Sequence, residues 1–291
     1  MPSTNLKPGD PLVLTLAADA RLGPTSYVND HIWELSLGSG EPPALAVQTT
    51  FGLRARSFRI FPRFIFKDTV ISDPATFSGP IHVKYQAPNF IRLECIPFPS
   101  INVEIEYWVP GSQILAGRTR LTNRRAEPVS LCLEWAPLLT PDANGQRMAP
   151  LDIGLTHLLA GKTSNLVPIL FVAGIVQPAT GPYTALARAL ELASHETQTV
   201  TWVSTAQETA EAALTQAQQI ARCNWDAAIA HLELVNASRI EIHSGNPDWD
   251  AAFLQAQNTA RSLVVTNPAG CTYPSTVSNR LPDQGFSLRG D

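Results

Sequence analysis

Residues 101–109 read INVEIEYWV, in which apolar and polar side chains alternate over the first six positions. Successive side chains of a β-strand point to opposite faces, so this alternation places one row against a core and the other row on the opposite face. Pro110, Gly111 and Ser112 follow at once and favour a turn. The stretch therefore predicts a half-buried strand that ends in a tight turn.

The same pattern recurs from about residue 10 to residue 204. Stretches 12–16, 32–37, 81–85 and 129–135 alternate in the same way, and clusters rich in Gly, Pro, Asn and Asp separate such stretches. Many short strands joined by regular turns are typical of an antiparallel sandwich. Because the region is long for a small immunoglobulin-type module, we expect a mainly β fold with two broad antiparallel sheets.

A helical pattern replaces the strand pattern after Ser204. Thr205 to Glu208 has the spelling of a capping box, in which a threonine oxygen accepts an early backbone N–H and a glutamate reaches back to the cap. Apolar residues follow at helical spacing, which predicts one helix over residues 205–234 with a bend near Cys223. A coiled coil is the alternative. The stripe is rich in alanine and only about four heptads long, which favours a helix lying against the sheets.

A second helix is predicted from Asn246. Asn246 is a good N-cap, Pro247 fits the first helical position because no donor is lost there, and Asp248 and Asp250 favour the positive end of the helix dipole. The helix is expected to end before Asn267. Its apolar stripe consists of Trp249, Phe253, Ala256, Ala260, Leu263 and Val264.

Composition argues against two classes of partner. A net charge of −4 and a pI near 5.9 provide no basic surface, so no nucleic acid is expected. The longest apolar run, Leu166 to Val176, is shorter than the ~20 residues of a membrane-spanning helix. The N-terminus has no charged start followed by an apolar core, so we expect no secretion signal, no membrane partner and a cytoplasmic location.

Histidines, cysteines and strand carboxylates form no reaction motif. The six histidines and four cysteines show neither HExxH nor CxxC spacing, so no metal site and no cofactor are expected. Glu104 and Glu106 share one face of the predicted strand, and Glu134 lies in another strand beside Trp135. Such strand carboxylates are commonly solvated, and we expect no catalytic role for them.

The segment from Gly270 to Asp291 gathers the residue types found in saccharide sites. Carboxylates, amides and guanidinium groups form directional bonds with several hydroxyls, while an aromatic face covers the apolar side of a sugar ring. Gly285 and Gly290 let a backbone approach a ligand closely. An ordinary polar surface loop is the alternative interpretation. The side chains in question are Tyr273, Asp283, Gln284, Phe286, Arg289 and Asp291.

The order of these elements resembles the front half of the glucoamylase-like, six-hairpin glycosidases. It consists of strands, a long connecting helix, a helix that begins with Pro-Asp-Trp-Asp at residues 247–250, and a loop that ends with Arg-Gly-Asp at residues 289–291. In those enzymes an N-terminal β super-sandwich packs through a helical linker against an (α/α)6 toroid that carries the catalytic carboxylates. The resemblance implies a large antiparallel β super-sandwich, a helical linker and the first helix of an incomplete toroid.

The final residues also resemble a sugar-binding motif of that group. Several families with this layout have an aromatic-x-x-x-Trp-x-Arg-Asp segment soon after the first toroid helix, and its arginine and aspartate hold sugar hydroxyls. Residues 286–291 lack the tryptophan, have a shorter spacing and place a glycine between arginine and aspartate. The resemblance implies substrate contacts for Arg289 and Asp291, and we add Asp283 and Gln284 as further candidates.

The resemblance divides the chain into a super-sandwich at residues 1–204, a helical linker at 205–245 and the start of a truncated toroid at 246–291. In the toroid families the catalytic acid and base lie on later loops, beyond Asp291, so no catalytic residue is expected here. We therefore expect the N-terminal fragment of a glycoside hydrolase, inactive alone, whose partners are the missing C-terminal toroid and an oligo- or polysaccharide. A stand-alone non-catalytic carbohydrate-binding or structural β-sandwich module is one alternative. A phosphorylase or lyase of the same architecture is another.

Overall fold

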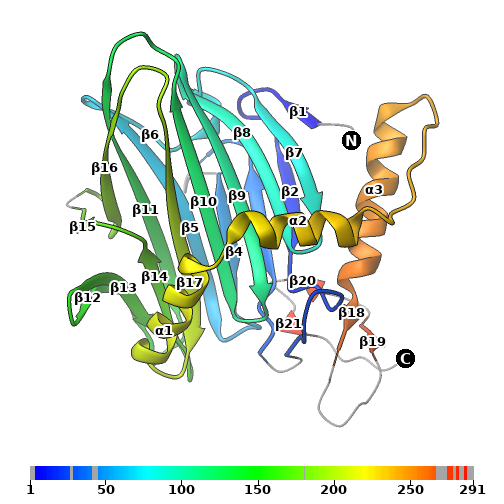
Figure 1. Cartoon of the computed structure of the whole chain (residues 1–291). Helices are drawn as coiled ribbons and strands as arrows, with labels where there is room; N and C mark the ends of the chain where they lie inside the picture. Colours follow the sequence, from blue (N-terminus) through cyan, green and yellow to red (C-terminus); the bar gives the residue numbers. More distant parts are fainter. Residues whose placement is uncertain are drawn as a thin grey trace.

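A computed structural model of the chain describes residues 4–26, 29–40, 45–179, 181–266, 274–277, 280–281 and 285–286. Two large antiparallel sheets lie face to face, and the helices follow them in the sequence (Figure 1). The predicted mainly β sandwich is confirmed. Residues 101–109 lie in one central strand, as their alternation predicts.

Within the described residues, the larger sheet has nine strands and the smaller has eight. The larger has the order β1 (Thr4–Leu6), β7 (Ile81–Ala87), β8 (Phe90–Phe98), β9 (Ile101–Gly111), β10 (Ile114–Asn123), β17 (Thr197–Gln207), β14 (Val167–Val172), β13 (Thr156–Lys162), β12 (Gln146–Ile153). The smaller has the order β15 (Gln177–Pro178), β16 (Leu186–Leu192), β11 (Val129–Pro141), β5 (Ala55–Phe66), β4 (Ala46–Thr49), β3 (Trp33–Leu37), β2 (Leu12–Leu16), and β6 (Thr69–Ile71) pairs with β5.

The main core lies between the two sheets. In β9 the residues Ile101, Val103 and Ile105 point into it, while the polar residues between them face the other way. Trp33 and Trp135 of the smaller sheet and Trp202 of the larger one are fully buried in the same core. The apolar rows of both sheets thus form one continuous core, which burial of apolar surface stabilises.

Gly117 in β10 leaves room for a tryptophan ring. It pairs with Trp202 of β17, and a β-carbon added at Gly117 meets Cε2 of that ring at 2.1 Å. We expect Gly117→Ala to lower the free energy of unfolding by about 1–3 kcal/mol, because a packed core resists added volume. Urea unfolding measures this loss. Gly23→Ala is the control, since nothing lies within 4 Å of the added carbon there; equal losses in both variants would contradict the close packing.

The prediction that a helix begins at Thr205 is wrong. β17 continues to Gln207, and Thr205 pairs with Ile114 on one side and with Ile169 on the other. A strand that is hydrogen-bonded along both edges prevails over a local capping signal. The helix α1 (Ala210–Arg222) begins after Thr209, whose side chain accepts a hydrogen bond from the backbone N–H of Ala212.

The single helix predicted over residues 205–234 is two helices. The chain is extended at Cys223, and Asn224 then caps α2 (Trp225–Asn236) by accepting a hydrogen bond from the N–H of Ala227. The break occurs where a bend was predicted, because asparagine competes for backbone donors and restarts the helix.

The third helix, α3 (Pro247–Ser262), begins as predicted. The Asn246 side chain accepts a hydrogen bond from the N–H of Asp248. Its burial pattern is unusual, because the side chains it buries are those of Asn258 and Ser262, while Trp249 is 70% exposed. α3 therefore places small polar residues against the rest of the chain and leaves its largest apolar residue uncovered.

The helices cover one outer face of the sandwich unequally. α1 packs on β17 and β14, and α2 crosses the outer face of the nine-stranded sheet (Figure 1). The Trp225 ring of α2 lies 5.2 Å from the Trp108 ring of β9, centroid to centroid. Gln86 of β7 donates a 2.6 Å hydrogen bond to Gln255 of α3. α3 therefore adjoins the β7 end of the sheet, and part of the face beyond α2 stays open.

Candidate functional site

The four predicted substrate contacts lie outside the described residues. These are Asp283, Gln284, Arg289 and Asp291. Their role therefore stays a prediction. Beside them the structure describes two short strands, β20 (Arg280–Leu281) and β21 (Gly285–Phe286), which pair antiparallel.

Arg280 connects this region to the sandwich, and sequence analysis missed it. Its guanidinium forms a buried ion pair with Asp30 and donates to the carbonyl oxygens of Ser262 and, at 3.2 Å, of Ala18. Burial raises the pKa of the Asp30 carboxyl, and the charge of Arg280 opposes that shift. A lone arginine in a polar loop carries no sequence signal for such a contact.

Further contacts join the same N-terminal loop to the helices. The hydroxyl of Thr25 accepts a 2.8 Å hydrogen bond from the N–H of Thr266, and the Thr266 hydroxyl accepts one from the N–H of Thr25. Arg21 bridges Asp19 and the buried Asn236 at the end of α2. The strands β18 (Val264–Val265) and β19 (Ser275–Thr276) continue from α3. Residues 17–26 and 29–31 thus hold the described C-terminal segments in place.

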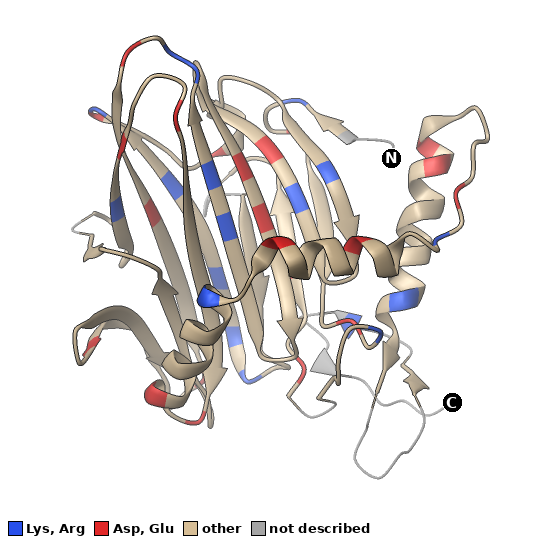
Figure 2. Cartoon of the chain, in the orientation of Figure 1, with Lys and Arg blue, Asp and Glu red and all other residues tan. Residues whose placement is uncertain are grey.

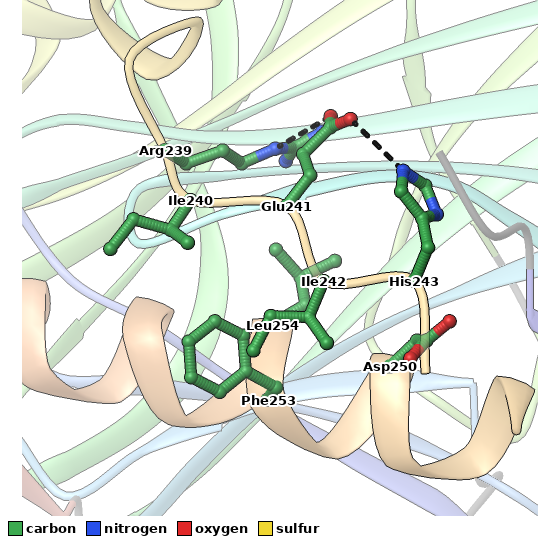
Figure 3. Close-up of a pocket in the computed structure, with 8 residues that line it drawn as sticks. All are labelled: Arg239, Ile240, Glu241, Ile242, His243, Asp250, Phe253 and Leu254. Atoms are coloured by element: carbon green, nitrogen blue, oxygen red, sulfur yellow. Dashed lines mark ion pairs between the residues drawn. The ribbon is translucent and has the colours of Figure 1, made fainter. Parts of the chain in front are cut away.

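A small hollow of about 190 Å³ lies between α3 and the segment that precedes it (Figure 3). Gln257 of α3 fixes that segment by hydrogen bonds to both the N–H and the carbonyl oxygen of Ile240. Asp250 accepts two further hydrogen bonds from Ser244, which hold the pKa of the Asp250 carboxyl below its ordinary value. The hollow is therefore a fixed feature between two bonded segments.

The walls of this hollow are apolar and its rim is charged. Ile240, Ile242, Phe253 and Leu254 line it. Trp249 lies one helical turn before Phe253, on the same side of α3. Ile240 is 65% and Ile242 41% exposed. We call these five residues the α3 surface.

Charged groups at the rim of the α3 surface engage one another. Glu241 lies 3.9 Å from both Arg239 and His243, as the dashed lines in Figure 3 show. Asp250, which lies near His243, accepts a hydrogen bond from the Ser244 hydroxyl. A surface with apolar walls and a charged rim is suited to packing against another polypeptide segment.

Between α2 and the nine-stranded sheet lies a network of charges, visible as alternating acidic and basic positions in Figure 2. Glu106 of β9 is 0% exposed and accepts hydrogen bonds from Arg92 at 2.9 Å and Arg118 at 2.6 Å. Arg118 also donates a 2.7 Å hydrogen bond to Asp226 of α2, and this bond lowers the pKa of the Asp226 carboxyl. The network attaches α2 to the sheet.

The expectation that the strand carboxylates are solvated is therefore wrong for two of them. Glu106 lies beneath α2 among arginines, and Glu134 of β11 forms a buried ion pair with Arg63 of β5. Arginines on neighbouring strands supply the opposite charge that makes this burial tolerable. Glu104 is half-buried and pairs with Arg120. These ion pairs cannot be predicted from sequence patterns, because they depend on which strands become neighbours in the sheets.

Beyond α2, the same sheet face forms a polar groove of about 290 Å³. Its side chains come from β7 to β10, from the residues that follow β10, and from β17. They include His82, Glu94, Asn102, Glu104, Arg120 and Arg124.

The described part of the chain contains no group of three or more His, Cys, Asp or Glu side chains placed to hold a metal ion. None of its helices has the length and hydropathy needed to cross a bilayer.

Comparisons with known proteins show a likeness of fold. No family model and no curated protein sequence matches the chain. A bacterial glucoamylase in complex with acarbose is similar in structure, with a TM-score of 0.54 and 9% identity over 90% of this chain and 44% of that one. At that identity the likeness shows the fold alone.

Two other solved structures are more distant. A protein from the human microbiome assigned as a kojibiose phosphorylase has a TM-score of 0.41 and 12% identity over 74% of this chain and 29% of its own. A protein of Escherichia coli K12 assigned as an aldose 1-epimerase has a TM-score of 0.40 and 8% identity over 67% of this chain and 99% of its own. The chain thus spans less than half of the glucoamylase and of the phosphorylase-like protein.

Proposed function

We propose that the chain is the sandwich-and-linker part of a carbohydrate-active enzyme of the six-hairpin type, a glycoside hydrolase, and that it supports a helical catalytic domain. The observation that carries this proposal is the α3 surface, where α3 exposes Trp249 and the segment before it exposes Ile240 and Ile242. The fold likeness over 90% of the chain to a bacterial glucoamylase supports it, since that structure extends well beyond the matched part.

The α3 surface has the properties of a packing face for helices. Covering a large apolar side chain contributes about 1.5–3 kcal/mol, so a partner that buries Trp249 and both isoleucines gains substantial stability. α3 follows α2 after a segment of residues 237–246, and its capped first turn carries Asp248 and Asp250. A helical domain whose first element is α3 uses this face. The division into sandwich, linker and start of the helical domain belongs to the same proposal, with the first boundary moved from residue 204 to the end of β17 at Gln207.

Three of the described carboxylates are unsuited to catalysis. Glycoside hydrolysis requires an acid and a base or nucleophile roughly 5–9.5 Å apart on either side of the bond. Glu106, Glu134 and Asp30 are buried in ion pairs with arginines, where they cannot reach a sugar. In line with the resemblance to the six-hairpin enzymes, we assign the acid and base to the helical domain.

An apolar fluorescent dye tests the α3 surface in the chain itself. Anilinonaphthalene sulfonate fluoresces when it binds exposed apolar surface. The folded chain is expected to bind it, and the double variant Ile242→Gln/Trp249→Gln to lose at least half of the signal. Leu155→Gln is the matched control, because Leu155 is 101% exposed at an isolated hairpin tip. Equal fluorescence of the double variant and the parent chain would count against the proposed packing face.

A second candidate function is a carbohydrate-binding sandwich that needs no catalytic domain. The polar groove on the nine-stranded sheet is the specific observation that favours it. In this second function the α3 surface binds no helical domain. If the α3 surface proves to have no partner, the carbohydrate-binding function therefore remains the better candidate.

A further inference from the structure

The polar groove occupies one transverse row of the nine-stranded sheet. The pairing registers place His82 opposite Glu94, Glu94 opposite Glu104, and Glu104 opposite Arg120. These side chains share the outer face, because residues that are directly opposite in a sheet point to the same side. α2 covers the next row, in which Glu106 is buried, and the strands extend beyond that helix (Figure 1). The groove is therefore an uncovered part of the outer sheet face, next to the part that α2 covers.

Most groove side chains are held in place before any ligand arrives. Lys84 lies 2.8 Å from Glu94, Glu104 pairs with Arg120, and His82 is hydrogen-bonded to Asn5 through Nδ1. The Thr122 and Thr197 hydroxyls lie 2.8 Å apart. A ligand that binds here meets polar groups whose positions are already fixed, which lowers the entropy lost on binding.

Two groove side chains are left without partners. Among the described residues, nothing bonds to the Asn102 side-chain amide or to the Arg124 guanidinium, although both line the groove. One amide offers a donor and an acceptor, and the guanidinium offers several donors. These two side chains can therefore form hydrogen bonds with a ligand without giving up a bond to another described residue.

The residue types favour an uncharged ligand with many hydroxyls. Two carboxylates and two guanidinium groups line the groove, so its formal charge is balanced. Carboxylates repel phosphates and other anions, whereas a sugar hydroxyl donates to a carboxylate and accepts from a guanidinium at the same time. The volume of about 290 Å³ is at the lower end of the range for small-molecule pockets.

We propose that this groove binds a neutral oligosaccharide, with Asn102 and Arg124 donating to its hydroxyls and Glu94 and Glu104 accepting from them. The site lies on the sheet and is separate from the α3 surface, so it does not depend on the helical domain. Among the described residues no Phe, Tyr or Trp side chain lines the groove, so binding rests on hydrogen bonds and is weak, in the millimolar range. The groove holds a polymeric substrate close to the catalytic domain. Several weak sites that bind the same polymer together hold it more tightly than any one of them alone.

Titration of the full chain with maltotriose, followed by nuclear magnetic resonance, tests this proposal. Saturable shifts are expected at β8, β9 and β10. Asn102→Ala and Arg124→Ala are each expected to weaken binding about two- to tenfold, the loss that corresponds to one hydrogen bond. Both side chains lack partners, so these variants should unfold at the same temperature as the parent chain. Arg56→Ala, an exposed arginine of β5 in the other sheet, is the matched control and should bind maltotriose normally.

Three results would overturn the proposal. One is the absence of saturable shifts at the groove. Another is binding that both groove variants leave unchanged. The third is tighter binding of a hexuronic acid trimer than of maltotriose, which would make the site one for anions. None of these results depends on dye binding at the α3 surface, so the two proposals fail separately.

Discussion

Arg280→Met is expected to lower the free energy of unfolding by about 3–5 kcal/mol, the loss typical of a buried ion pair that loses one partner. Asp30 is buried, and Arg280 is its ion-pair partner among the described residues, so the variant leaves a buried carboxylate without its opposite charge. The carbonyl oxygens of Ala18 and Ser262 lose their donor as well. Urea unfolding of the parent chain and the variant measures the difference.

Two companion variants make this prediction specific. Asp30→Asn in the Arg280→Met background is expected to recover part of the loss, because it removes the uncompensated charge. Arg56→Met, at an exposed position, should stay within about 0.5 kcal/mol of the parent chain. If Arg280→Met changed stability as little as Arg56→Met does, the contact would not anchor the C-terminal segments to the sandwich.

Acid is expected to destabilise the chain through His31. This side chain is fully buried beside Phe51, neither ring nitrogen has a partner among the described residues, and burial lowers its pKa from 6.5 to about 3, with Arg54 adding to the shift. Between about pH 6.5 and pH 3 the His31 side chain is therefore protonated in the unfolded chain and neutral in the folded chain. Stability falls by about 1.4 kcal/mol per pH unit between about pH 6.5 and pH 3 from this group.

His31→Leu removes this contribution. Between pH 6 and pH 4.5 the stability of the variant should decline less steeply than that of the parent chain, by about 1.4 kcal/mol per unit. Urea unfolding at several pH values measures both slopes. His231→Leu, at an exposed position of α2, serves as the control and should follow the parent chain. Parallel profiles for His31→Leu and the parent chain would show that His31 does not resist protonation.

The sandwich could be predicted from the sequence because its signal is local. The alternation of residues 101–109 is repeated in enough strands to fix the fold class, and the Asn246 cap fixes the start of α3. The Thr205 cap failed for a tertiary reason, since pairing on both edges of β17 prevails over it. Local patterns predict elements well where no distant strand competes for the same backbone groups.

The candidate sites depend on contacts that the sequence does not reveal. Arg280 meets Asp30 across 250 positions, and Glu106 is enclosed by arginines of two neighbouring strands and by α2. The polar groove exists because two registers align Glu94, Glu104 and Arg120 in one row. Each of these features is set by strand order, which no single stretch of sequence encodes.

We propose that this chain supports a catalytic domain and that the acid and base of glycoside hydrolysis belong to that domain. The most direct test is hydrolysis of malto- and gluco-oligosaccharides by residues 1–291, alone and joined to the polypeptide encoded directly downstream of Asp291, with and without inorganic phosphate. We predict no turnover by residues 1–291 alone and phosphate-independent hydrolysis by the joined polypeptide. Turnover by residues 1–291 alone, a requirement for phosphate, or a stop codon directly after that of Asp291 would contradict the account.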